Sequence, residues 1–221
     1  MHRTRVKICG VTRPEDAVAA ARAGADAIGM IFYPPAPRNI SLDRARAILA
    51  ALPPFVTPVG VFVNALAEEL LDTAAQLGLR TVQLNGEESP DNVAELEGLQ
   101  VIKAIRVGRS AADELQRWRT SRPGNLIGFV LEPAGTGQHG GSGVANDWAA
   151  IKAAQDAGAF RDLPPLIAAG GLTTATVAEV VRTIQPWAVD VSSGVEESLG
   201  VKSPQKIEAF IRAAREGSQP S

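Results

Sequence analysis

The sequence predicts an α/β protein, a single-domain (β/α)8 TIM barrel over residues 1–215, and three observations favour this fold class. Eight short runs of apolar and β-branched residues alternate with segments of helical periodicity. The carboxyl ends of successive runs lie 21 to 37 residues apart, a length that suits right-handed β-α crossovers. A doubly wound sheet usually stops at about six strands, so eight units favour the closed barrel.

The expected strands are short and mostly apolar, as strands buried between a barrel interior and surrounding helices should be. In chain order they cover residues 6–9, 27–32, 59–63, 81–84, 101–105, 126–131, 166–168 and 188–191. No segment between them has the composition of an interdomain linker.

Helix signals fill the intervals between these strands. Thr12 and Glu15 predict a capping box before a first helix over 17–23. Gly78 is a plausible C-cap, and three serines are typical N-caps: Ser41, Ser89 and Ser203. Further helices are expected over 66–77, 111–118, 147–154, 174–184 and 204–214. The polar segment 216–221 has no periodicity, and we expect it to be a disordered tail.

Composition excludes several classes of function. The 22 Lys and Arg against 24 Asp and Glu give a net charge of −2 with neither sign concentrated, so we expect no nucleic-acid partner. No run approaches the ~20 apolar residues of a membrane span, and no signal-peptide core follows the basic N-terminus, so we expect a cytoplasmic protein. One cysteine and two histidines are too few for a disulfide or a zinc site, and we expect neither metal nor cofactor.

Polar residues at strand ends are the candidate catalytic groups, because barrels of this kind form their active sites there. Cys9 ends the first strand and offers a thiolate for proton transfer, although a buried cysteine is more often a small hydrophobe. Glu132 follows the sixth strand, where partial desolvation would raise its pKa and keep it an acid. The alternative for Glu132 is a solvated rim charge.

Two further residues are candidates for binding a substrate. Arg38 lies in a proline-rich loop that would hold its guanidinium ready to grip a carboxylate bidentately, although a surface arginine over a helix end is as plausible. Asp190 interrupts the eighth strand and needs a partner or a substrate hydroxyl to offset its desolvation. A structural hydrogen bond would satisfy Asp190 equally well.

Glycine-rich loops after the last two strands are candidates for phosphate binding. Gly170 and Gly171 follow the seventh strand, and Ser193 and Gly194 follow the eighth, where barrels commonly bind phosphate through backbone N–H groups. Tight turns are the ordinary use of such glycines. A literal G-x-G-x-x-G at 135–140 is not followed directly by a helix, so we interpret it as a mobile lid rather than a dinucleotide site.

Taken in order, these residues resemble the phosphoribosylanthranilate isomerases, the (β/α)8 enzymes of tryptophan biosynthesis. The resemblance runs through nearly the whole chain, and its motifs are KICG at 7–10, PRNIS at 37–41, VGVF at 59–62, QLNGE at 83–87, GGSG at 140–143, AGGL at 169–172, VDVSSGVE at 189–196 and GVK at 200–202. It implies a cofactor-independent Amadori rearrangement of N-(5-phosphoribosyl)anthranilate, a phosphosugar, by a monomer or homodimer.

The resemblance also implies roles for the candidate residues. Cys9 would be the general base and Glu132 the general acid, although the family has aspartate at the latter position. Arg38 would bind the anthranilate carboxylate and Asp190 a ribose hydroxyl, and the phosphate would lie against Gly170, Gly171, Ser193 and Gly194. Two smaller departures are Asn85, where the family usually has histidine, and Asn146, where an aromatic residue usually stands.

Three other functions fit part of the pattern. A pentulose-phosphate epimerase would share the phosphate loops but usually needs metal-binding histidines, which this chain lacks. A phosphosugar-binding relative without catalysis is conceivable because Glu132 replaces the family's aspartate. A Rossmann oxidoreductase is disfavoured by the missing helix and by the number of strands.

Overall fold

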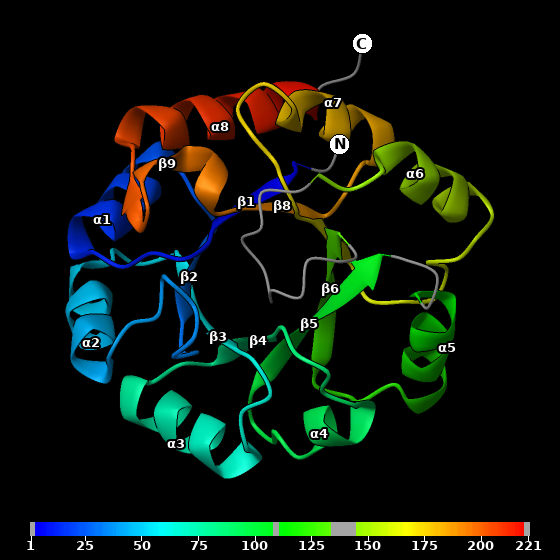
Figure 1. Ribbon diagram of the computed structural model, residues 1–221, viewed down its shortest axis with the longest axis horizontal. Coiled ribbons are helices and arrows are strands. Elements are labelled where there is room, and N and C mark those ends of the chain that lie inside the picture. Colours follow the sequence, from blue (N-terminus) through cyan, green and yellow to red (C-terminus); the bar gives the residue numbers. More distant parts are fainter. Residues whose placement is uncertain (1–2, 108–110, 134–144, 219–221) are drawn as a thin grey trace.

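Eight parallel strands close into a barrel in chain order, which confirms the predicted (β/α)8 fold (Figure 1). The computed structural model describes residues 3–107, 111–133 and 145–218. The strands are β1 Arg5–Ile8, β2 Ala27–Ile31, β3 Thr57–Phe62, β4 Thr81–Leu84, β5 Gln100–Val107, β6 Leu126–Pro133, β7 Leu166–Ala168 and β8 Ala188–Val191. Each overlaps a predicted apolar run.

Helices surround the barrel and bury the outward faces of its strands (Figure 1). They are α1 Pro14–Ala23, α2 Leu42–Ala51, α3 Ala67–Leu77, α4 Pro90–Ala94, α5 Ala111–Ser121, α6 Trp148–Asp156, α7 Val177–Ile184 and α8 Pro204–Gly217. The expected serine N-caps form on α2, α4 and α8, and Gly78 ends α3 with a φ of 66°. These local signals therefore set several helix ends as predicted.

The predicted capping box at the start of α1 does not form. The N-cap is Arg13, which makes no side-chain capping bond, and Thr12 Oγ1 instead donates a 2.6 Å hydrogen bond to the carbonyl of Gly200. Asp16, rather than Glu15, is buried and pairs with Arg13 at 2.6 Å. A long-range carbonyl thus competes successfully with the local helix end for the Thr12 hydroxyl.

Two features near the C-terminus were not expected from the sequence. The short 3-10 helix η1 (Ser193–Val195) is followed by an antiparallel pair of strands, β9 (Glu196–Ser198) and β10 (Val201–Lys202). Helix α8 continues to Gly217, beyond the domain end expected at residue 215, and packs so closely on α7 that a β-carbon at Gly217 would lie 2.6 Å from the carbonyl oxygen of Ala178.

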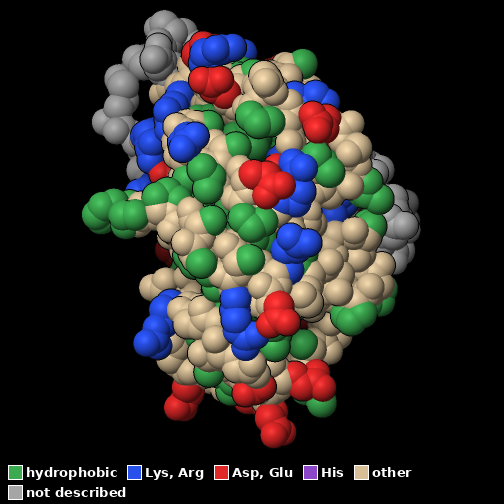
Figure 2. Space-filling model, turned by 90° about the vertical axis from the view of Figure 1, so that its left-hand side faces the viewer, with side chains coloured by type: hydrophobic (Ala, Val, Ile, Leu, Met, Phe, Trp, Pro, Cys, Tyr) green, Lys and Arg blue, Asp and Glu red, His purple; other side chains and the backbone are tan. Residues whose placement is uncertain are grey.

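Several sequence expectations fall on residues that the structure does not describe, namely the glycine-rich segment 135–143 and the end of the tail, 219–221. Among the described residues, none of the helices is long and apolar enough to cross a membrane. On the face shown in Figure 2, basic and acidic side chains are interspersed, in keeping with the net charge of −2.

The interior of the barrel is lined by every second residue of each strand. On this pattern the side chains of Lys7 in β1 and of Cys9 directly after it point into the barrel. Those of Gln83 in β4, Asn85 directly after it and Glu132 in β6 do the same. The barrel closes between β1 and β8, where Lys7 is the register partner of Asp190. Polar side chains from opposite halves of the chain therefore meet in the barrel at its carboxyl end.

Candidate active site

Cys9 lies at the end of β1, buried against β2. Its backbone N–H donates a 2.8 Å hydrogen bond to the carbonyl of Val191, which fixes the end of β1 on β8. A β-carbon built on Gly29 would lie 2.8 Å from Cys9 Sγ and 3.2 Å from Lys7 Nζ. The thiol and the amine therefore share the small space that Gly29 leaves open.

Opposing charges act on this thiol. Burial raises the pKa of Cys9, and the carboxylate of Asp190 adds to the rise, while the charges of Lys7 and Lys202 oppose it. Burial alone would lower the pKa of Lys7, but Asp190 and Cys9 outweigh it, so that the Lys7 pKa lies above its ordinary value and the amine stays charged. A permanent cation thus stands beside the candidate base.

Asp190 is held from one side only. Its Oδ2 accepts a 2.8 Å hydrogen bond from Lys7 Nζ, and both side chains are buried. Its Oδ1 is also buried but has no hydrogen-bond partner within the described part of the chain. A buried carboxylate oxygen without a donor costs free energy, which a ligand hydroxyl would recover.

Glu132 accepts the last hydrogen bond in a series of side-chain amides that starts on β4. Asn85 Nδ2 donates to Glu132 Oε1 at 3.1 Å, and Asn85 Oδ1 accepts from Gln83 Nε2 at 2.6 Å. Burial raises the pKa of Glu132, Asp190 raises it further, and the hydrogen bond from Asn85 counteracts them in part. A glutamic acid that stays protonated to higher pH can donate a proton to a substrate.

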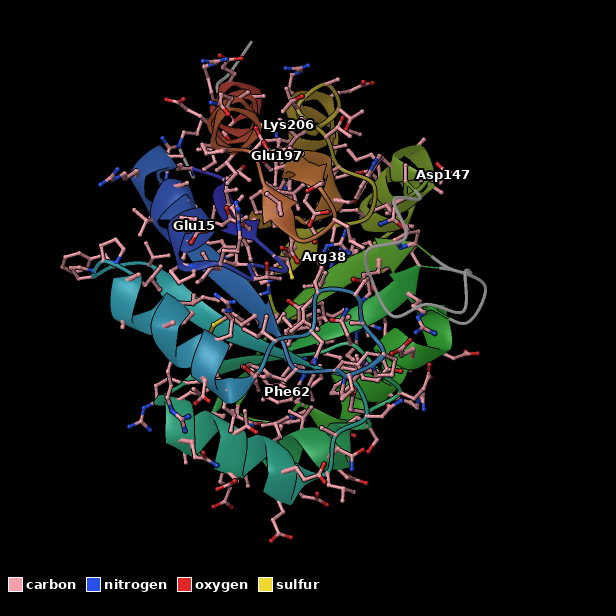
Figure 3. The ribbon with its side chains drawn as sticks, turned by 60° about the vertical axis from the view of Figure 1, so that its left-hand side comes forward. Glu15, Arg38, Phe62, Asp147, Glu197 and Lys206 are labelled. Atoms are coloured by element: carbon pink, nitrogen blue, oxygen red, sulfur yellow. The ribbon has the colours of Figure 1, made fainter. Side chains whose placement is uncertain are left out.

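Arg38 is buried and already engaged by a carboxylate of this chain. Its Nε and Nη2 donate to Oε1 and Oε2 of Glu196, each at 2.7 Å. Oε1 of Glu196 also accepts a 2.9 Å hydrogen bond from Lys202. The bidentate grip expected for Arg38 is thus used within the protein, which leaves one guanidinium nitrogen, Nη1, without a hydrogen bond to the described residues. Figure 3 labels Arg38 near the middle of the ribbon.

The two expected phosphate loops adjoin each other. Gly170 and Gly171 have φ values of 88° and 62°, so glycine is needed there for the backbone itself. A β-carbon at Gly194 would lie 2.0 Å from the carbonyl oxygen of Leu172, so this glycine allows the loop after β8 to approach the loop after β7. Together with Ser193 in η1, these residues present backbone amides at neighbouring strand ends.

Asn146, one of the departures from the family pattern, supports this arrangement. Its Nδ2 donates to the carbonyls of Leu131 and Ala169, at 3.0 and 2.8 Å, and so ties the chain before α6 to the ends of β6 and β7. Asp147 then caps α6. Asn146 thus holds backbone in place beside Glu132 and Gly170.

Sequence reasoning missed four of the buried polar residues that shape this site: Lys7, Gln83, Glu196 and Lys202. A lysine and a glutamine on the inward face of otherwise apolar strands are a visible signal, because such groups need partners when buried. Glu196 carried no such signal, since its partner Arg38 is 158 residues away in the chain.

Comparison with known proteins decides the family. The family model described as N-(5'phosphoribosyl)anthranilate isomerase matches residues 6–213. The chain belongs to this family. An N-(5'-phosphoribosyl)anthranilate isomerase from Pseudomonas savastanoi pv. phaseolicola is 48% identical over 215 residues, which cover 96% of this chain and 98% of the relative.

Solved phosphoribosylanthranilate isomerases have the same architecture. The crystal structure of the Thermotoga maritima isomerase is 38% identical, with a TM-score of 0.82 over 96% of this chain and 98% of that one. A structure of such an isomerase in complex with reduced 1-(o-carboxyphenylamino)-1-deoxyribulose 5-phosphate is 38% identical, with a TM-score of 0.80 and the same coverage. The family predicted from the sequence motifs is therefore confirmed, as is its barrel fold.

Proposed function

We propose that this phosphoribosylanthranilate isomerase converts N-(5-phosphoribosyl)anthranilate to 1-(2-carboxyphenylamino)-1-deoxyribulose 5-phosphate in tryptophan biosynthesis, without a cofactor, and that Cys9 and Glu132 are its base and acid. One observation carries the assignment of the pair. Cys9 directly after β1 and Glu132 in β6 lie at the carboxyl ends of two strands of one closed barrel, and the carboxylate of Asp190 on β8 raises the pKa of both.

The reaction needs one proton donor and one proton acceptor. Glu132 protonates the ring oxygen of the ribose, and the C–O bond at the first sugar carbon breaks to give an open-chain iminium. The iminium acidifies the neighbouring carbon, and the Cys9 thiolate removes the proton from it. The resulting enolamine tautomerises to the aminoketose, and the proton held by Cys9 returns to Glu132 through solvent, so the cycle closes with no net proton and no external oxidant or reductant.

The remaining residues bind the substrate. Nη1 of Arg38 binds the anthranilate carboxylate, and the unpartnered Oδ1 of Asp190 accepts a hydrogen bond from a ribose hydroxyl. The phosphate lies against the backbone amides of the loops after β7 and β8, at Gly170, Gly171, Ser193 and Gly194. We further propose a cytoplasmic location and a monomer or homodimer.

The loss of phosphoribosylanthranilate fluorescence tests this function. The substrate is made in place from anthranilate and phosphoribosyl pyrophosphate by a transferase, and wild type is compared with Glu132→Asp. Acceleration by wild type beyond spontaneous decay supports the isomerase with Glu132 as acid. Acceleration by Glu132→Asp alone would mean that the natural chain binds without catalysing this reaction or acts on another substrate. Acceleration by neither would contradict the proposed function.

A further inference from the structure

Glu196 is a buried carboxylate held between two cations beside the candidate site. It accepts both bonds of the Arg38 fork and a third hydrogen bond from Lys202, at 2.7, 2.7 and 2.9 Å. The side chains of Arg38, Glu196 and Lys202 are only 8%, 7% and 0% exposed. A bidentate fork fixes the plane of a guanidinium as well as its position.

The path of Arg38 is confined along its whole length. A β-carbon at Gly10 would lie 2.6 Å from Arg38 Cδ and 2.9 Å from Ser192 Oγ, so Arg38 crosses directly over the residue after Cys9. Lys202 Nζ donates to the carbonyl and the hydroxyl of Ser192, at 3.1 and 3.3 Å. Glu196 and its partners thereby join the segments that follow β1, β2 and β8.

Electrostatics also stabilises the ionised carboxylate of Glu196 between Arg38 and Lys202. The hydrogen bonds that Arg38 donates to Glu196 raise the pKa of Arg38. Burial alone would raise the pKa of Glu196, but Arg38 and Lys202 outweigh it and hold the pKa below its ordinary value. Glu196 is therefore ionised, and its single negative charge is shared between two cations.

We propose that Glu196 is a positioning residue, which holds the Arg38 guanidinium so that Nη1 is left to bind the substrate carboxylate. The inference rests on the proposed function, in which Arg38 binds that carboxylate. Without the charge of Glu196, Arg38 and Lys202 repel each other and the guanidinium loses its fixed plane. The anthranilate carboxylate of the substrate takes no part in the bond changes, so Arg38 binds it equally in the ground and transition states. The loss of binding free energy therefore raises KM and leaves kcat unchanged.

The variant Glu196→Gln removes the charge and keeps the shape of the side chain. We expect its dissociation constant for reduced 1-(o-carboxyphenylamino)-1-deoxyribulose 5-phosphate, and its KM, to rise about tenfold or more. We expect kcat to stay within about twofold of wild type. Calorimetric titration with the reduced product, together with steady-state kinetics, measures both.

Two control variants change nearby groups but leave the Arg38 fork intact (Figure 3 labels both sites). Glu197→Gln makes the same charge change at the next residue of β9, which is exposed. Lys206→Met removes an amine that donates a 2.6 Å hydrogen bond to the backbone carbonyl of Glu196 and not to its carboxylate. Both controls should bind the reduced product with an affinity within about twofold of wild type.

A second background separates positioning from a general structural role. In Arg38→Ala, the added change Glu196→Gln should have little further effect on affinity, because Glu196 acts through Arg38. An equal loss in both backgrounds, an unchanged affinity, or a loss confined to kcat would overturn the inference. If Glu196→Gln does not fold, Glu196→Asp is the second variant, because it keeps the charge but shortens the side chain that accepts the Arg38 fork. A folded Glu196→Asp with wild-type affinity would also overturn the inference. Absence of wild-type turnover would instead contradict the proposed function.

Discussion

Lys7 determines the charge beside the candidate base. The amine shares the space over Gly29 with Cys9 Sγ and is anchored by Asp190 at 2.8 Å. Its positive charge favours the thiolate, whereas burial of Cys9 favours the thiol. At the scale of single residues, the base strength of Cys9 therefore depends on a lysine two positions earlier on the same strand.

The variant Lys7→Met tests this dependence. Loss of the positive charge, with the carboxylate of Asp190 left in place, should raise the pKa of Cys9 further above its ordinary value. The fraction of thiolate near neutral pH should fall about tenfold or more. Since the chain has a single cysteine, the difference in ultraviolet absorbance from the Cys9→Ser form of the same protein, as a function of pH, reports the Cys9 thiolate alone. A midpoint at the same or a lower pH would contradict the prediction, and Lys206→Met serves as a control.

At the scale of elements, the lack of a side chain at one position of β2 makes room for the base on β1. We expect Gly29→Ala to push Cys9 and Lys7 out of place, because its β-carbon would lie 2.8 Å from Sγ. A displacement of about 1 Å can lower kcat on the order of 10²-fold. The control is Gly124→Ala, where a β-carbon meets nothing within 4 Å. Comparable kcat values for the two variants would refute the prediction.

The loop between β4 and α4 depends on a buried ion pair. Lys103 and Glu88 lie 3.1 Å apart with side chains 1% and 6% exposed, and the lysine also donates to the carbonyl of Gly86. Removing one partner of a buried pair costs about 3 to 5 kcal/mol of stability. We therefore expect Glu88→Gln to lower the free energy of unfolding by about this amount, as measured by urea denaturation.

A neighbouring carboxylate provides the matched comparison for this ion pair. Glu87 is 76% exposed and lies 3.2 Å from Arg106, itself 36% exposed. Exposed pairs contribute about 0 to 1 kcal/mol, so Glu87→Gln should leave stability almost unchanged. Equal losses in Glu87→Gln and Glu88→Gln would show that burial does not distinguish the two pairs.

Local sequence signals predicted elements well where the partners were also local. Ser41, Ser89 and Ser203 cap the helices that begin directly after them. Thr12 fails as a cap because the carbonyl of Gly200, distant in the chain, accepts its hydroxyl. The strand β9 was missed for the same reason, since its buried residue Glu196 is stabilised by long-range partners that no local pattern contains.

At the scale of the whole molecule, closure of the barrel assembles the site. The first and last strands pair in the register Lys7 to Asp190, so the two ends of the chain together supply a cation and a carboxylate that act on the pKa of Cys9. The positions of Cys9, Glu132 and Asp190 followed from strand order and alternation, which the sequence contains. The engagement of Arg38 by Glu196 depends on how three loops pack, and the sequence pattern could not predict it.

The most direct test of the proposed chemistry is the turnover of Cys9→Ser, measured by loss of substrate fluorescence alongside its affinity for the reduced product. A serine hydroxyl is a far weaker acid than a thiol, so a base at this position is nearly abolished while the binding loops remain. We expect turnover to fall about 10²-fold to 10⁴-fold. The dissociation constant for the reduced product, whose phosphate the loops bind, should stay close to that of wild type. Turnover near the wild-type value would contradict the assignment of Cys9 as the base.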